Sequence, residues 1–205
     1  MLGYMVIKAT GIGQPWRALV KVVLSTTFLG VGISYGLVAD WPHVTMLVPI
    51  ALLFAWIGDA LLLAKHKLAY FHTGCLFFGI SNVLLTAYAI HVYKWQWWSL
   101  IAFAVFMVAM FLCQRYNVFS FGKSKRYLNF YSLAVGYNGF LGLSIALTVA
   151  STPAILFGLG CFMFLVSDFA LAMFMFKCKK WPIDVLNSLL YFSGLMLIAL
   201  SLAYN

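Results

Sequence analysis

Residues 153–176 read PAILFGLGCFMFLVSDFALAMFMF, an apolar run whose only charged side chain is Asp168. A helix needs about 20 apolar residues to cross the roughly 30 Å of hydrocarbon in a bilayer, so this run is long enough to span one. Residues 44–64 have the same character and carry Asp59. The sequence therefore predicts two membrane-spanning helices that each hold one carboxyl group.

The composition of the whole chain agrees with this local pattern. Of 205 residues, 65% are hydrophobic, 18% are aromatic and only 8% are charged, whereas soluble domains carry about 25% charged residues. Charged or proline-bearing breaks divide the chain into seven runs of spanning length, at 18–38, 44–64, 69–91, 97–113, 127–150, 153–176 and 183–203. We expect residues 1–205 to form one all-α domain, a polytopic bundle of about seven transmembrane helices.

The basic residues fall almost entirely on one side of this topology. Those on the shared side are Lys8, Arg17, Lys21, Lys65, Lys67, Arg115, Lys123, Lys125, Arg126, Lys177, Lys179 and Lys180, and Lys94 falls on the other. By the positive-inside rule the N-terminus is cytoplasmic and the C-terminus lies outside, in the inner or plasma membrane if the protein is bacterial. The net charge of +9 then reflects topology and anionic lipids, and nucleic-acid binding is disfavoured.

Asp59 and Asp168 are the candidates for chemistry. A carboxyl group inside the membrane costs several kcal/mol unless it is paired, hydrated or protonated, so its presence indicates a functional site. Asp59 lies about six residues, or roughly 9 Å, before the basic end of its helix, and Asp168 lies about nine residues, or roughly 13 Å, before the end of its own. We therefore predict both carboxyl groups in the cytoplasmic leaflet. Asp40 and Asp184 are predicted at helix ends near water, without a special role.

Further polar residues are predicted at the same depth. The candidates for substrate binding among them are Lys21, Asn82, Tyr137, Asn138, Ser167 and Tyr191. A polar layer drawn from several helices suggests a cavity that opens toward the cytoplasm. The alternative is that these side chains only form hydrogen bonds between helices.

The two aspartates also stand in similar local sequences. Gly58-Asp59 is followed by Leu62, and Ser167-Asp168 is followed by Leu171, in helices that run in the same direction. This echo favours two parallel units of three helices around a central fourth, a 3+1+3 arrangement, although chance explains two short matches equally well.

The motifs WIGDALLL at 56–63 and GCFMFLVSDFALA at 160–172 resemble the YhhN/TMEM86 family of membrane proteins, whose characterised members are lysoplasmalogenases. The resemblance covers residues 16–202. The positions that match the family's two motifs are Gly58, Asp59, Leu62, Phe164, Ser167, Asp168, Leu171 and Ala172. Lys21, Tyr137 and Tyr191 are similar to further family positions. Asn82, Leu85 and Leu195 depart from the family, which often has histidine, tyrosine and glutamine or histidine there.

The resemblance implies hydrolysis of the vinyl ether bond of a lysoplasmalogen, which releases a fatty aldehyde and a glycerophospho-alcohol. This reaction needs one carboxylic acid to protonate the vinyl carbon and one carboxylate to support the resulting cation, as in glycosidases. Asp59 and Asp168 would share these roles, in an order that the sequence does not assign. Lys21 would pair with a carboxylate or hold the headgroup phosphate, and Asn82, Tyr137 and Ser167 would orient the reacting groups.

No cofactor and no metal are expected. The histidines show no clustered spacing, since His43, His66, His72 and His91 are predicted at helix ends or near loops. Two other classes of function remain open from the sequence: a small proton- or cation-coupled transporter that uses the same two aspartates, and a lipid-binding or assembly protein without activity. The substrate lysophospholipid and membrane lipids are the expected partners, and the sequence leaves open a monomer or a homo-oligomer.

Overall fold

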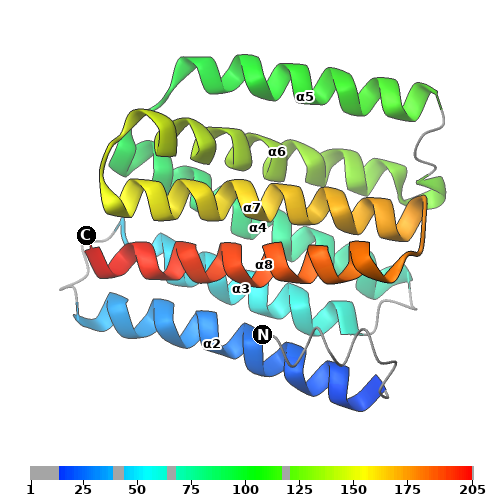
Figure 1. Ribbon diagram of the computed structural model, residues 1–205, viewed down its shortest axis with the longest axis horizontal. Helices are drawn as coiled ribbons and strands as arrows, with labels where there is room; N and C mark the ends of the chain where they lie inside the picture. The colour runs from blue at the N-terminus through cyan, green and yellow to red at the C-terminus, as the bar shows by residue number, and fades with distance from the viewer. Residues whose placement is uncertain (1–13, 39–43, 64–67, 117–120, 205) are drawn as a thin grey trace.

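The computed structural model describes residues 14–38, 44–63, 68–116 and 121–204, and these ranges form seven α-helices and two short 3₁₀ turns (Figure 1). The helices are α2 (Gln14–Val38), α3 (Leu47–Leu63), α4 (Leu68–Tyr93), α5 (Trp97–Arg115), α6 (Lys125–Thr148), α7 (Thr152–Phe176) and α8 (Trp181–Ser201), and the turns are η1 (Gly122–Ser124) and η2 (Leu202–Tyr204). All seven predicted spans are confirmed as helices, with ends that differ by a few residues.

Six of these helices are long and apolar enough to cross a membrane. The exception is α3, whose 17 residues rise about 26 Å. The chain is therefore a multi-pass integral membrane protein with an all-α fold. Its orientation, N-terminus inside and C-terminus outside, stays a prediction.

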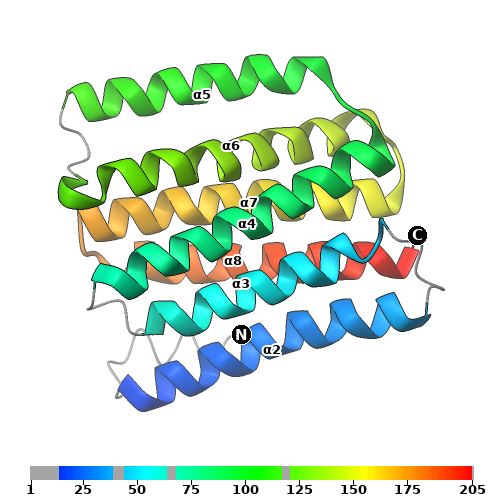
Figure 2. The same ribbon diagram turned by 180° about the vertical axis from the view of Figure 1, so that it is seen from behind.

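The contacts between helices close six of them into a ring. The remaining helix, α5, lies outside the ring at the edge of the bundle (Figures 1 and 2). Going round the ring, the contacting pairs are α2 with α3, α3 with α4, α4 with α6, α6 with α7, α7 with α8, and α8 with α2. At the edge of the bundle, α5 packs against α6. The ring can be divided into two halves, α2–α4 and α6–α8. The last helix of each half then contacts the first helix of the other half, α4 with α6 and α8 with α2. The helix arrangement thus matches the predicted 3+1+3 order.

The second half of the ring is held together by glycines at close helix crossings. A Cβ atom on Gly158 of α7 would overlap the carbonyl oxygen of Gly142 in α6. A Cβ atom on Gly160 would lie 2.6 Å from the carbonyl oxygen of Gly194 in α8. Only glycine permits such approaches, and close packing of small residues is how helices associate in lipid. α7 is consequently fixed against both of its neighbours.

The half of the bundle that contains the end of α4 and the start of α7 is packed with large apolar side chains. Tyr88 of α4 and Phe157 of α7 are fully buried, with ring centroids 5.1 Å apart. Leu52, Ile145 and Ile198 are also fully buried in the same core. Open space is therefore concentrated at the opposite end of the ring.

Candidate active site

A cavity of about 290 Å³ lies at the end of the bundle where α2, α4, α6 and α8 begin. All seven helices contribute to its wall. The polar residues in the lining are Lys21, Asp59, Tyr131, Ser132, Asp168, Asp184, Asn187, Ser188 and Tyr191, and the large apolar residues include Phe71, Phe78, Phe106, Met110, Phe121, Leu128 and Phe176. Both intramembrane aspartates thus face one cavity. Apart from Lys94, the basic residues of the described chain gather at this same end, which is the end predicted to be cytoplasmic.

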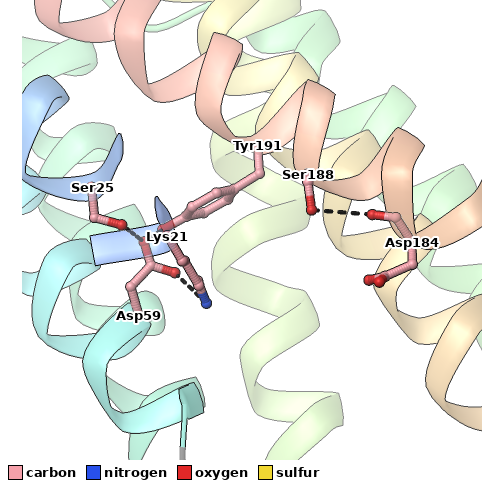
Figure 3. A network of polar contacts seen from close by, with 6 residues as sticks. All are labelled: Lys21, Ser25, Asp59, Asp184, Ser188 and Tyr191. Atoms are coloured by element: carbon pink, nitrogen blue, oxygen red, sulfur yellow. Dashed lines mark hydrogen bonds and ion pairs between the residues drawn. The ribbon is translucent and has the colours of Figure 1, made fainter. Parts of the chain in front are cut away.

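Asp59 is held by three side chains from two neighbouring helices (Figure 3). The ammonium nitrogen of Lys21 lies 2.8 Å from Asp59 Oδ1. The hydroxyl groups of Ser25 and Tyr191 donate to Asp59 Oδ2 at 2.5 and 2.9 Å. Lys21 and Ser25 reach the same carboxyl group because residues four apart share one face of a helix. Asp59 is 4% exposed, and this set of donors compensates its burial as a carboxylate.

Asp168 has a much simpler environment. The hydroxyl group of Tyr131, on α6, donates to Asp168 Oδ2 at 2.5 Å. Among the residues that the structure describes, Asp168 has no ion pair, and no hydrogen bond joins it to Asp59. The two carboxyl groups stand on α3 and α7, which are opposite members of the six-helix ring. They share a cavity but are held independently.

Four of the six predicted substrate-binding residues lie outside the cavity lining, and three of them, Asn82, Asn138 and Tyr137, make hydrogen bonds elsewhere in the bundle. Asn138 donates from Nδ2 to Asn82 Oδ1 at 2.9 Å, and Asn82 donates from Nδ2 to the Phe78 carbonyl oxygen at 2.9 Å. Tyr137 accepts a hydrogen bond of 2.9 Å from Nε1 of Trp95, at the far end of the bundle. These contacts are interhelical or local, which is the alternative that the sequence left open.

The residues predicted to form one polar layer therefore lie at two depths. They differ in depth because they stand at different distances along their helices. Asn82 is 14 residues into α4 and Asn138 is 13 residues into α6, so both lie about 20 Å from the cavity end of their helices. Asp168 is only eight residues, or about 12 Å, from the end of α7. The prediction that all these residues share a depth was wrong for the two asparagines and for Tyr137.

The other predicted residues have mixed outcomes. Lys21 and Tyr191 line the cavity and contact Asp59. Ser167 is fully buried and donates to the Phe164 carbonyl oxygen at 2.7 Å, away from the cavity lining. Ser167 thus satisfies its hydroxyl group within α7 and does not orient its neighbour Asp168.

A family model described as the YhhN family matches residues 16–202 of this chain. This match covers most of the sequence and all seven helices. The chain belongs to the YhhN family. No curated protein and no solved structure matches it.

Two of the departures of this YhhN chain from the family pattern lie in its apolar core. Leu85 and Leu195 are fully buried. The third, Asn82, is fully buried and bonded to Asn138 as described above. All three lie outside the lining of the cavity. The altered side chains therefore affect the packing of the core and not the residues that form the cavity wall.

The sequence did not identify several polar residues that the structure places at the cavity or against its aspartates. Ser25 and Tyr131 each bond an aspartate, and Asp184 lines the wall although it was assigned no role. Ser25 could have been found as the residue one turn after Lys21. Tyr131 lies six residues after the start of α6, which places it at nearly the depth of Asp168.

The described residues do not suggest a metal centre. Within those ranges, no three His, Cys, Asp or Glu side chains are grouped as metal ligands would be. The expectation that the protein needs no metal stays a prediction.

Proposed function

We propose that this YhhN protein hydrolyses the vinyl ether bond of lysoplasmalogens, with Asp168 as the acid and Asp59 as the base. The observation that carries the proposal is the pair of carboxyl groups on opposite walls of one cavity, in unlike environments. Family membership supports the same class of reaction.

Asp59 is suited to the role of the charged base. A carboxylate offers about four lone-pair sites, and Lys21, Ser25 and Tyr191 occupy three of them. One site on Oδ1 is left to accept a proton from water. The adjacent ammonium group of Lys21 offsets the negative charge that a base in this position would carry.

Asp168 is suited to the role of the proton donor. Tyr131 occupies Oδ2, which leaves Oδ1 to carry the proton. No cation among the described residues contacts this carboxyl group, and apolar side chains such as Leu165 and Phe169 line the cavity beside it. A carboxyl group in such surroundings favours its neutral form over an unpaired buried charge.

The reaction would then proceed in balanced steps. Asp168 transfers its proton to the β-carbon of the vinyl ether, which leaves an oxocarbenium cation and an Asp168 carboxylate. Water adds to the cationic carbon as Asp59 takes its proton, giving a hemiacetal. The C–O bond to glycerol then breaks, Asp59 returns its proton to the departing oxygen, and Asp168 regains one from the hemiacetal hydroxyl group. The products are a fatty aldehyde and a glycerophospho-alcohol, with one water consumed.

The shape of the cavity fits a single-chain lipid better than a transported ion. The lining carries most of its polar groups on α2, α3 and α8, and it is apolar at Phe106 and Met110 of α5 and at Leu128 of α6. The opposite half of the ring is closed by buried aromatic and aliphatic side chains. A transporter would require a continuous polar path through that half, whereas the buried polar side chains described beyond the cavity, such as Asn82, Asn138 and Ser144, bond to one another or to backbone carbonyl oxygens.

The direct test uses purified protein with a lysoplasmalogen and with its sn-1 ester analogue, and it follows aldehyde and fatty acid release. We expect aldehyde from the vinyl ether and no fatty acid from the ester, and we expect the Asp168→Asn protein to release neither. Fatty acid release by the wild type would indicate an esterase. Absence of both products from folded wild-type protein would reject the proposal.

A further inference from the structure

Three aromatic rings lie together between the helices that carry the two aspartates. The ring centroid of Phe78 on α4 is 5.9 Å from that of Tyr191 on α8 and 6.1 Å from that of Phe164 on α7. The centroids of Tyr191 and Phe164 are 5.4 Å apart. Tyr191 bonds Asp59, and Phe164 stands one helical turn before Asp168. The cluster therefore extends from the surroundings of one carboxyl group to those of the other.

Within this cluster, Phe78 is the phenylalanine that reaches the cavity. Phe78 and Tyr191 line it, whereas Phe164 is 1% exposed and lies outside the lining. Phe78 stands ten residues, or about 15 Å, after the start of α4, and Asp168 stands about 12 Å before the end of α7. The ring of Phe78 thus lies at nearly the depth of the proposed proton donor.

A glycine allows the ring of Phe78 to pack beside Asp59. A Cβ atom on Gly58 would lie 2.9, 3.0 and 3.1 Å from Cε2, Cζ and Cδ2 of that ring. A contact at the edge of a ring approaches only one or two carbons, so three nearly equal distances place Gly58 over one face. Gly58 directly precedes Asp59 in α3. The absence of a side chain at Gly58 therefore fixes the ring next to the proposed base.

The proposed reaction creates a positive charge in this part of the cavity. Proton transfer from Asp168 to the vinyl carbon leaves an oxocarbenium cation. The face of an aromatic ring attracts a cation within about 6 Å of its centroid, most strongly where water is excluded, and Phe78 is only 5% exposed. The ring has no basic atom, so it can stabilise the cation without taking the proton of Asp168 and without competing with Asp59 for water.

We propose that Phe78 is a further catalytic residue, whose ring lies against the oxocarbenium cation and stabilises it. This inference rests on the proposed function, because the cation forms only if the vinyl ether is protonated. The neutral ether of the bound substrate gains little from the ring, whereas the cation gains much. An interaction of this kind lowers the barrier and adds little to substrate binding, so kcat depends on Phe78 and KM does not.

The test replaces Phe78 with phenylalanines that carry one, two or three fluorine atoms on the ring. Fluorine withdraws charge from the face of the ring and changes its size only slightly. We expect kcat for aldehyde release to fall stepwise, to about a tenth of the wild-type value with three fluorines, while KM changes less than twofold. Phe78→Leu removes the ring and should lower kcat at least as far.

Phe164 provides the matched control, because it belongs to the same cluster but not to the cavity lining. The same three fluorinated replacements of Phe164 should leave kcat within about twofold of the wild type. A purely structural role for the cluster would instead affect both positions alike. If Phe78→Leu does not fold, the fluorinated variants decide the question, since they retain the shape of the ring.

Binding of a charged analogue separates this inference from the proposed function. Two single-chain lysolipid probes differ at one atom, because one has a neutral ether oxygen at the sn-1 position and the other has a protonated secondary amine there. They are titrated against the full-length protein in nanodiscs, with empty nanodiscs as the blank. Three fluorines on the Phe78 ring should weaken binding of the amine about tenfold and binding of the ether less than twofold.

Each outcome decides one of the two proposals. A kcat that does not change with fluorination of Phe78, or an equal loss on fluorination of Phe78 and of Phe164, would overturn the role of Phe78. Aldehyde release by the wild type in either case would leave the hydrolase proposal intact. A protein that binds the amine in the expected, fluorine-sensitive way but releases no aldehyde would instead reject the hydrolase and keep the cation site.

Discussion

Asp59 and Asp168 occupy equivalent places in the two halves of the ring, yet their surroundings differ. Each lies in the middle helix of a three-helix unit, and each is bonded by the helix before it: Asp59 by Lys21 and Ser25 of α2, and Asp168 by Tyr131 of α6. The first half supplies a cation where the second half supplies a phenol. Two similar arrangements of three helices thus differ in their polar partners: Asp59 has three donors and Asp168 has one.

The difference teaches how one cavity can contain an acid and a base of the same residue type. An ammonium group and two hydroxyl groups satisfy a negative charge, whereas a single phenol among apolar side chains does not. These partners fit the proposed roles, in which Asp59 is the base and Asp168 is the proton donor. Exchanging their partners would exchange their roles, and each prediction below tests one part of that contrast.

The largest effect is expected from removing either carboxyl group. Asp168→Asn removes the proton donor and Asp59→Asn removes the base, so each should lower kcat for aldehyde release by at least about 100-fold. The double variant should be little worse than either single variant, because the two groups act as one unit. Steady-state kinetics on monodisperse protein provide the measurement. Near-normal kcat in either single variant would remove that aspartate from the mechanism.

The next largest effect is a difference in stability between the Asp59→Asn and Asp168→Asn variants. Asp59→Asn leaves the ammonium group of Lys21, whose side chain is 19% exposed, without its carboxylate, and breaking a buried ion pair costs about 3 kcal/mol or more. Asp168→Asn keeps an oxygen for Tyr131 and should lower Tm far less. Thermal unfolding in detergent can compare the two, and the double variant Lys21→Met with Asp59→Asn should recover part of the loss. Equal Tm values for the two asparagine variants would contradict the contrast in charge.

Much of the fold could be read from the sequence because the bilayer imposes a strong constraint on it. Charged breaks such as 64–67 and 177–180 bound apolar runs whose length is set by the membrane, and the helices follow those runs. The two aspartates could be identified for the same reason, since an intramembrane carboxyl group is costly.

The partners of the aspartates were harder to predict because they depend on helix rotation and on where each helix starts. Tyr131 and Tyr137 are six residues apart on α6, and six residues turn a helix by about 240° relative to a common face. The hydroxyl group of Tyr131 therefore reaches Asp168, and that of Tyr137 reaches Trp95. Asp184 was overlooked for a related reason, because a helix-end acid near water can still line a cavity that opens at that end.

A smaller effect is expected from the two tyrosines that bond the aspartates. Tyr131→Phe removes the one described partner of Asp168 and should lower kcat about tenfold with little change in KM. Tyr191→Phe leaves Lys21 and Ser25 on Asp59, so kcat should fall no more than about threefold. The ratio of the two kcat values is the quantity to compare. A larger loss for Tyr191→Phe would mean that Asp59 depends on its hydroxyl donors more than on its ion pair.

The smallest effect is expected at Tyr137, which the sequence predicted to bind substrate and the structure places against Trp95. Tyr137→Phe removes one hydrogen bond at the far end of the bundle, worth about 1 kcal/mol of stability, and leaves every residue of the cavity lining unchanged. We therefore expect kcat and KM within about twofold of the wild type and a slightly lower Tm. Tyr131→Phe is the matched control, because it makes the same chemical change on the same helix. A tenfold loss of kcat in Tyr137→Phe would show that the hydroxyl group of Tyr137 reaches the substrate, and the two polar layers would then have to work as one.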